Sequence, residues 1–387
     1  LNLSENGFIV GMGNFSHGFR TFSSLFYFHS ILYLPLINFY LFHIGPFLIL
    51  LFFNMIFLDR FHSSIKKNKL DISYYFLLLS FIFVNIVFYR IGEHGTDRSA
   101  QILLILIFLF FVEILYLQKN KKEILLSFYT LLIIIFLASS MKVIYYLYLI
   151  LIPIILYKKN LIGIFLKKQH FLIISFLSIS IFLNLITNYL NTGCFLYPAG
   201  KSCLIQSEWS IPKDEVVSMG IHYEWWAKAG GGPNYSSEIP KDVYIKNFNW
   251  IENWIDRHFF NKVSDTILGI ISICLISYFL FYFSSQKKKN KKYKNYYLVY
   301  IFAIIFLAEW FLNHPSMRYG GFVLFAIPLF IFTASRIEYL NIAKKKIFLN
   351  SIFLIILTLL IFNLRNVIRI NKEIDIYNYN IFRSPFF

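Results

Sequence analysis

The stretch that decides the fold is "QILLILIFLFFVEILYLQKNKKE", residues 101–123. An apolar block broken by a single carboxylate, Glu113, ends there in a short connection that carries three lysines. Blocks of about 15–21 such residues recur along the chain, and 58% of its 387 residues are hydrophobic. A helix needs about 20 apolar residues to cross a bilayer. Because backbone in lipid must satisfy its own hydrogen bonds, the pattern predicts an all-α, polytopic integral membrane protein.

We expect about ten transmembrane helices and one large extracytoplasmic loop. The spans lie near residues 43–60, 72–89, 101–117, 124–138, 142–157, 170–190, 265–284, 295–312, 318–334 and 348–363. Several are short, so tilt or bilayer thinning must help, and 124–138 with 142–157 could instead form one broken helix pair. Three regions follow: a first membrane half over 1–190, a Trp-rich outer loop over 191–264, and a second membrane half with an outer tail over 265–387.

The basic residues predict the orientation of these helices. Five connections hold 21 of the 37 Lys and Arg residues but few acids, so they carry the whole formal charge of +17: residues 60–71, 118–123, 158–169, 286–294 and 335–347. By the positive-inside rule this face is cytoplasmic. The heavy use of Tyr, Phe, Ile, Lys and Asn indicates an AT-rich bacterial genome. We therefore expect the membrane to be the bacterial inner membrane. Nucleic-acid binding, the rival interpretation of a basic chain, is disfavoured because the charge is divided among short connections.

The N-terminal stretch "LNLSENGFIVGMGNFSHGF" (1–19) has no basic start and no apolar core, so it is not a signal peptide. The alternation of connections places it outside the cell. We therefore expect at least one further span upstream of Leu1; the alternative is a short start that translocates unaided.

Two of the three cysteines, Cys194 and Cys203, lie in "TGCFLYPAGKSCLIQSEW" (192–209). An oxidising compartment and the eight residues between them favour a disulfide, the alternative being two free thiols. Cys274 lies within a span and is expected to pack as a small apolar residue. No Cys/His set has the spacing of a zinc site, and the sequence leaves the cofactor, including a divalent metal, open.

All six tryptophans fall on the predicted outer side: Trp209, Trp225, Trp226, Trp250, Trp254 and Trp310. They could form an aromatic belt at the membrane interface. They could also form a platform for a carbohydrate or a lipid headgroup, for which Trp225 and Trp226 are the candidates. Residues 244–260 have the apolar spacing of an interfacial amphipathic helix.

Ionisable residues cluster at two predicted outer connections. "RIGEHGTDRSA" (90–100) holds Arg90, Glu93, Asp97 and Arg98, either as a self-neutralising ion-pair cluster or as an acid–base and phosphate site. "EWFLNHPSMRYGG" (309–321) holds His314 and Arg318, and Lys142 is a third outer cation. Ionisable groups near the membrane are functional candidates. The candidate catalytic residues are Glu93 and Asp97; the candidate substrate-binding residues are Arg90, Arg98, Lys142, His314, Arg318, Trp225 and Trp226.

Three stretches resemble a family of bacterial envelope proteins that look like glycosyltransferases of the GT-C superfamily: "GFIVGMGNFSHGFRTFSSLFYFHSILYLP" (7–35), "GEHGTDRSAQ" (92–101) and "TGCFLYPAGKSC" (192–203). The resemblance implies a helical membrane protein that moves a sugar from a polyprenyl-phosphate donor to a glycan or lipid acceptor outside the cell. The hallmark acidic residue of the superfamily lies in the first outer loop, which would fall upstream of residue 1. With this resemblance, charge and placement suggest that an arginine holds the donor phosphate and that Glu93 or Asp97 orients the acceptor hydroxyl.

Three other functions stay open. A polysaccharide polymerase or ligase would also use polyprenyl-linked glycans, and its product would distinguish it. A transporter or flippase predicts internal repeats, which the sequence lacks. A non-enzymatic membrane scaffold would tolerate neutralisation of both charged clusters. The expected partners are membrane lipid, the lipid-linked sugar and its acceptor, and no nucleic acid.

Overall fold

The computed structural model describes residues 7–34, 39–67, 70–91, 95–118, 120–165, 167, 170–204, 206–232, 234–285, 287–288 and 294–378. The chain divides into two compact units. The first contains Leu1–Phe53, Gly95–Gly269 and Lys294–Pro328, and the second contains Asn54–His94, Ile270–Tyr293 and Leu329–Phe387.

Helices make up almost all regular structure in the first unit. They are η1 (Met12–Asn14), η2 (His17–Phe19), α2 (Ser24–Ile31), η3 (Phe39–His43), α5 (Gly95–Val112) with its π-helical end η4 (Glu113–Leu117), α6 (Lys121–Met141), η5 (Val143–Ile150), α7 (Leu151–Lys158), α8 (Ile162–Phe165), α9 (Phe171–Thr192), η7 (Gly200–Ser202), α10 (Lys213–Ala227), α11 (Lys241–Tyr244), α12 (Ile251–Trp254), η8 (Ile255–Val263), α14 (Tyr297–Asn313) and η9 (Met317–Tyr319).

The second unit holds two further helices, α4 (Ile72–Val87) and α16 (Lys344–Tyr377). Three helices contribute residues to both units: α3 (Ile44–Lys67), α13 (Ser264–Phe283) and α15 (Gly321–Glu338). The described strands are two-residue pairs. In the first unit β1 (Gly231–Gly232) pairs antiparallel with β2 (Tyr235–Ser236), and in the second β3 (Lys287–Lys288) pairs antiparallel with β4 (Leu340–Asn341).

The expectation of a helical chain is confirmed, and seven of the described helices are long and apolar enough to cross a membrane. They are Leu41–Lys67, Gly95–Leu117, Lys121–Met141, Phe171–Thr192, Ile251–Phe283, Gly321–Glu338 and Lys344–Tyr377. Three apolar helices are shorter, namely Ile72–Val87, Val143–Lys158 and Tyr297–Asn313. Together they coincide with the expected apolar segments. Lys142 separates α6 from η5 because its backbone is extended, with φ −148° and ψ 123°.

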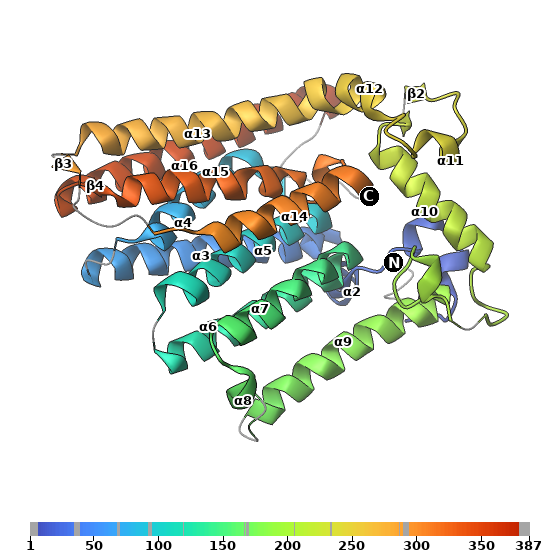
Figure 1. Ribbon diagram of the computed structural model, residues 1–387. Helices are drawn as coiled ribbons and strands as arrows, with labels where there is room; N and C mark the ends of the chain where they lie inside the picture. The colour runs from blue at the N-terminus through green and yellow to red at the C-terminus, as the bar shows by residue number, and fades with distance from the viewer. Residues whose placement is uncertain are drawn as a thin grey trace. The chain divides into compact units, whose positions relative to one another are not determined.

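α5 is the central helix of the first unit. Its apolar residues from Ile102 to Val112 are all buried, so it has no polar face. Phe108 meets Phe306 of α14 and Tyr148 of η5 edge to face, at centroid distances of 6.0 and 6.3 Å. Edge-to-face aromatic pairs add stability beyond the area they bury. These contacts fix α5 against α14 and η5, and α6 packs beside it (Figure 1).

α4 has the corresponding place in the second unit, where every residue from Ile72 to Asn85 is buried. Asp71 begins the helix by accepting a hydrogen bond from the Tyr74 backbone N–H. The Tyr74 hydroxyl donates to Ser351 Oγ at 2.7 Å, and the long helix α16 packs along α4. Cys274 is buried with a free thiol, as expected of a small apolar residue.

The prediction of one helix over residues 244–260 is wrong about the residue at which that helix begins. Asn247 and Phe248 adopt left-handed backbone, with φ 50° and 62°, which L-residues rarely adopt and which no helix can contain. α11 therefore ends at Tyr244. The chain becomes helical again at Ile251 and continues through α12 and η8 into α13 without a break.

Candidate functional site

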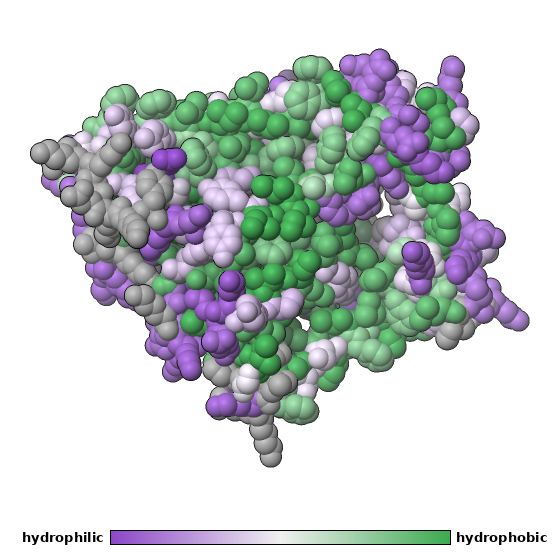
Figure 2. Space-filling model, viewed as in Figure 1, coloured by the Kyte–Doolittle hydropathy of each residue, from purple (hydrophilic) through white to green (hydrophobic). Residues whose placement is uncertain are grey.

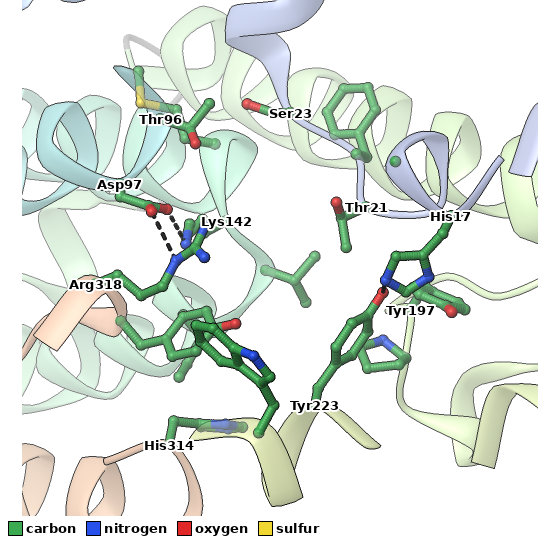
Figure 3. Close-up of a pocket in the computed structure, with 18 of the residues that line it drawn as sticks. His17, Thr21, Ser23, Thr96, Asp97, Lys142, Tyr197, Tyr223, His314 and Arg318 are labelled. Carbon is green, nitrogen blue, oxygen red and sulfur yellow. Dashed lines mark hydrogen bonds and ion pairs between the residues drawn. The ribbon is translucent and has the colours of Figure 1, made fainter. Parts of the chain in front are cut away.

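Three charged side chains from distant parts of the chain form an ion cluster, which we define as Asp97, Lys142 and Arg318. Asp97 Oδ2 accepts from Arg318 Nε at 2.9 Å, and Lys142 Nζ forms an ion pair with Asp97 Oδ1. Asp97 is 6% exposed, whereas half of the Arg318 side chain is exposed. The carboxylate is therefore buried between two cations, and one of those cations remains accessible (Figure 3).

The turn that carries Arg318 is held from three directions. Gln101, one helical turn after Asp97 on α5, donates to the backbone carbonyls of Met317 and Arg318 at 3.2 and 3.3 Å. The indole N–H groups of Trp254 and Trp310 donate to the carbonyls of Pro315 and Ser316 at 2.7 and 2.9 Å. These bonds fix the turn before any ligand arrives, so Arg318 starts from a rigid base.

Lys142 enters the cluster because α6 stops one residue before it. The extended backbone at Lys142 directs its ammonium toward Asp97, and the ammonium also lies 4.5 Å from the centre of the Tyr319 ring. Burial lowers the pKa of Lys142 below its ordinary value; Asp97 opposes this shift and Arg318 adds to it. Asp97 is therefore the counter-charge of a buried ammonium.

The ion cluster lines one side of a cavity of about 500 Å³. The lining comes from residues 17–26, 96–97, 141–144, 197–198, 222–226 and 314–319, all within the first unit. His17 and Tyr223 lie on the other side of it, with Tyr223 Oη 3.2 Å from His17 Nε2 (Figure 3). We call these two residues the histidine–tyrosine pair. Cavities of a few hundred Å³ with a few convergent polar groups are typical of small-molecule sites.

A disulfide links Cys194 and Cys203, as expected. Both are buried in a small apolar cluster with Tyr197, Ile211 and Val216, and Tyr223 packs against this cluster. The polar stretch at residues 192–209 is thus a compact loop. It carries Tyr197 into the cavity wall and supports Tyr223 on α10.

The structure brings together some of the sequence-predicted site residues and leaves others apart. Asp97, Lys142, His314, Arg318 and Trp226 all line the cavity. Arg98 is half-buried beside Asp97 and is not among the described residues that line it. Arg90 belongs to the second unit, and Glu93 lies outside the described residues. Of the two predicted carboxylates, the site therefore rests on Asp97.

The adjacent residues Trp225 and Trp226 have different environments. Trp225 is 7% exposed and packs against Gly230 and Gly231, where an added Cβ would come within 2.2 and 2.1 Å of its indole. Trp226 lines the cavity, and the Arg318 guanidinium lies 5.7 Å from its ring centre. Of the predicted pair, Trp226 alone faces the cavity.

Of the four remaining tryptophans, Trp209 is half-buried against Tyr189, and the other three are buried. Trp250, Trp254 and Trp310 are each less than 7% exposed. Trp254 packs edge-on against both of the others, at centroid distances of 6.2 and 6.5 Å. The rings of Trp254 and Trp310 support the turn at residues 314–320.

His314 is also in the cavity wall, next to cationic neighbours. Burial lowers its pKa to about 4, and the positive charges of Lys228 and Lys142 contribute. The imidazole is therefore neutral at pH 7. Among the described residues, no group of three or more His, Cys, Asp or Glu side chains is arranged to hold a metal ion.

Sequence reasoning missed three features of this site: Gln101, Tyr197 and Tyr223. The spacing of Asp97 and Gln101, four residues apart on a predicted helix, was a signal for a shared face. Met219, Tyr223 and Trp226 also follow helical spacing in a polar segment. Tyr197 carried no signal, because it reaches the cavity through the fold of the disulfide loop.

Comparison with known proteins identifies a family. No curated protein and no solved structure matches the chain. A family model described as a domain of unknown function, DUF8201, matches residues 2–325. This range contains every described residue that lines the cavity. The chain belongs to the DUF8201 family.

Proposed function

We propose that this protein is a multi-pass membrane glycosyltransferase of the GT-C type, which transfers a sugar from a polyprenyl-phosphate donor to an envelope glycan or lipid. The observation that carries the proposal is the ion cluster in the cavity wall, because it offers cations at a concave site. Under this proposal the cavity opens on the extracytoplasmic side of the bacterial inner membrane.

Membrane insertion accounts for the apolar surface of the long helices. α9 exposes Leu172, Phe176, Ile179 and Leu183, at 80%, 65%, 57% and 57% of their surface. Their spacing places them on one helical stripe. Apolar side chains cover much of the surface over α9 and α13 (Figure 2). Each Å² of apolar surface left in water costs about 25 cal/mol, so contact with lipid would stabilise such a stripe.

The proposed orientation follows from the ends of the helices in the first unit. α5 begins beside the cavity at Gly95, and its far end leads into the basic connection at residues 118–123. α6 returns from that connection and ends at Met141, again beside the cavity. Because basic connections favour the cytoplasm, the cavity would face the other side.

Labelling of single added cysteines tests this orientation. We expect a membrane-impermeant maleimide to label Lys246→Cys in intact cells and to label Lys122→Cys only after the cells are opened, since both positions are exposed. The reverse pattern would invert the orientation, and equal labelling of both in intact cells would contradict membrane insertion between them.

The ion cluster has the chemistry of a phosphate site. Two cations against one carboxylate leave a net positive charge. Arg318 is half exposed and can contact an incoming phosphate while its Nε stays on Asp97. Guanidinium groups bind phosphate oxygens through paired, charge-assisted hydrogen bonds. Both Asp97 oxygens are engaged by cations, so its role is to orient Lys142 and Arg318 and not to accept a proton.

The aromatic residues beside the cluster suit a sugar. Trp226 and Tyr319 both line the cavity, and each ring centre lies 5.7 Å from the Arg318 guanidinium. A sugar bound to phosphate at Arg318 would therefore lie over aromatic faces. Such rings cover the apolar C–H faces of carbohydrates, and they also restrain the guanidinium by cation–π attraction.

A transfer assay with matched arginine variants tests the proposal. The purified protein in lipid nanodiscs is given a panel of radiolabelled polyprenyl-phosphate sugars with an envelope lipid extract as acceptor. We expect Arg318→Ala to lower transfer about 100-fold or more, the cost of losing a charged contact to the leaving phosphate. The transfer rate of Arg318→Lys should lie between those of Arg318→Ala and the unmodified protein, because lysine keeps the charge but not the paired hydrogen bonds.

The control is Arg257→Ala, which removes an exposed arginine that lies over the Tyr235 ring, outside the cavity. Its transfer rate should equal that of the unmodified protein. Equal loss in both variants, or no loss in Arg318→Ala, would contradict the proposed phosphate site. A product extended by many repeat units would instead identify a polymerase.

A further inference from the structure

The histidine–tyrosine pair offers polar groups across the cavity from the ion cluster (Figure 3). Tyr223 lies on α10 and His17 begins η2, 206 residues away in the chain. Their rings are 5.3 Å apart, and Tyr223 Oη lies 3.2 Å from His17 Nε2. Both residues line the cavity. The two sides of the cavity therefore differ in chemistry: one carries ionic groups and the other carries a hydrogen-bonded phenol and imidazole.

Backbone contacts hold His17 in this position. The segment before it lies against the end of α9, where the Gly11 backbone N–H donates to the Leu190 carbonyl at 2.8 Å. The Asn191 side chain donates to the Phe19 carbonyl at 2.6 Å. Gly13 is needed here, because an added Cβ would come within 2.9 Å of the Asn191 carbonyl oxygen. η2 is thus attached to a long helix on both sides of His17.

An ion pair then connects this segment to α10. Arg20 Nη2 contacts Glu215 Oε1 at 2.6 Å, and Arg20 Nε donates to the Gly13 carbonyl at 3.1 Å. Tyr223, two turns after Glu215 on the same helix, packs on the disulfide cluster. The pair is therefore built by two segments that are each fixed independently of it, which is the arrangement expected of a preorganised site.

The protonation of the pair follows from its surroundings. Burial is the main cause that raises the pKa of the Tyr223 phenol well above its ordinary value, and the neighbouring Tyr197 adds to the shift. The phenol therefore keeps its proton at neutral pH, and its oxygen lies within hydrogen-bond distance of His17 Nε2. The imidazole beside the phenol offers a second position for a proton.

We propose that the histidine–tyrosine pair takes the proton from the acceptor hydroxyl during sugar transfer. The inference rests on the proposed function, and it assigns to these two residues the role that sequence reasoning gave to a carboxylate. Asp97 is unsuited to it because both its oxygens are held by cations. The histidine–tyrosine pair lines the same cavity, and its Tyr223 hydroxyl lies against an imidazole nitrogen and not in an ion pair.

The acceptor oxygen forms a bond to the anomeric carbon as the bond from that carbon to the donor phosphate oxygen breaks. The bonding electrons leave with the phosphate, whose charge is stabilised by Lys142 and Arg318. The acceptor proton passes to Tyr223 Oη while the phenolic proton passes to His17 Nε2. His17 is exposed, so the imidazolium returns its proton to water after the product leaves.

The test separates donor binding from transfer in the same nanodisc preparations. Binding of undecaprenyl phosphate, in place of the unidentified donor, is measured by native mass spectrometry, and transfer is measured as above. We expect His17→Gln and Tyr223→Phe each to lower transfer about 100-fold, within the range of general acid–base catalysis. Binding of undecaprenyl phosphate should be unchanged in both. Matched controls are His258→Gln and Tyr235→Phe, which alter the same residue types outside the cavity.

The pH profile adds a measurement that a structural role would not change. The acid limb of the transfer rate should disappear in His17→Gln. Tyr223 and His222 are the titratable groups that interact with His17. Tyr197, Tyr319 and Arg20 act on Tyr223, the other member of the pair. An unchanged acid limb in His17→Gln with full transfer would overturn the proposal and leave the phosphate site intact. The unmodified protein could also bind undecaprenyl phosphate through Arg318 and yet transfer no sugar. That result would refute the proposed transferase, and this inference with it.

Discussion

The two sides of the cavity are built in different ways. The ion cluster lies where long apolar helices begin or end: Asp97 in the first turn of α5, Lys142 directly after α6, and Arg318 in the turn between α14 and α15. The histidine–tyrosine pair lies on an irregular segment and on α10, which depend on the disulfide and on contacts to α9. One side is therefore fixed by the helical core, and the other by a separate assembly that contains the disulfide.

This difference explains why the two sides are unequally visible in the sequence. A charge at the end of an apolar helix costs free energy unless it is paired, so its presence stands out against the surrounding residues. A neutral His and Tyr in a polar segment cost little and resemble many surface residues. If the two sides are also energetically independent, a substitution on one side should leave the contribution of the other side to stability and binding unchanged.

The largest effect is expected from Asp97→Ala. It leaves Lys142 buried beside Arg318 without a counter-charge, and removing one partner of a buried ion pair costs about 3–5 kcal/mol. Thermal unfolding in detergent, followed by tryptophan fluorescence, measures the loss. The double variant Asp97→Ala/Lys142→Met should recover most of it, because the unpaired ammonium is also removed. If the double variant is as unstable as the single one, the cost does not come from the charge.

The next largest effect is expected from Trp225→Ala. It should lower the free energy of unfolding by about 3 kcal/mol, because it empties the space between α10 and the glycines at 230 and 231. Trp226→Ala is its neighbour and control. It should change stability by less than about 1 kcal/mol and weaken binding of undecaprenyl phosphate up to about tenfold, because the Arg318 guanidinium loses the cation–π restraint of the Trp226 ring 5.7 Å away. Similar profiles for the two variants would contradict their separate roles.

Much of the fold could be predicted from the sequence. Apolar blocks separated by basic connections located the helices that coincide with α3, α5, α6 and the others, because helix length and polarity are local properties. The start of the helix near residue 250 could not be predicted, since apolar spacing does not report the left-handed backbone at Asn247 and Phe248. Periodicity describes which residues can share a face, but not where the backbone turns.

The candidate site was predicted in part, for a related reason. Asp97, Lys142 and Arg318 were each singled out, yet Asp97 and Arg318 are 221 residues apart, and nothing local states that they meet. Trp225 and Trp226 were both predicted to bind substrate. Adjacent residues on a helix point about 100° apart, so only the neighbours of α10 decide that one ring is buried and the other faces the cavity.

Removal of the disulfide tests the assembly that contains it, separately from the helical core. Cys194→Ser/Cys203→Ser should lower the unfolding free energy by about 2–3 kcal/mol, the cost of opening a loop of this length. Tyr223 packs on the affected cluster, so transfer should fall while binding of undecaprenyl phosphate at the ion cluster remains. Dithiothreitol should bring the unmodified protein to the same unfolding temperature and leave the double variant unchanged. A parallel loss of lipid binding would show that the two sides are coupled.

The smallest expected effect concerns His314, which lies on the side of the ion cluster. Its pKa is about 4 in the folded protein, and about 6.5 is ordinary for an unfolded chain. Between these values the unfolded chain binds more protons, so stability falls as the pH is lowered from 6.5 toward 4. A third of the side chain is exposed, so solvent screening keeps this contribution small. Unfolding temperatures at pH 7 and pH 5 should therefore differ slightly less in His314→Gln than in the unmodified protein. A larger acid sensitivity in the variant would mean that His314 is charged in the fold, and that the ion cluster tolerates a third cation beside it.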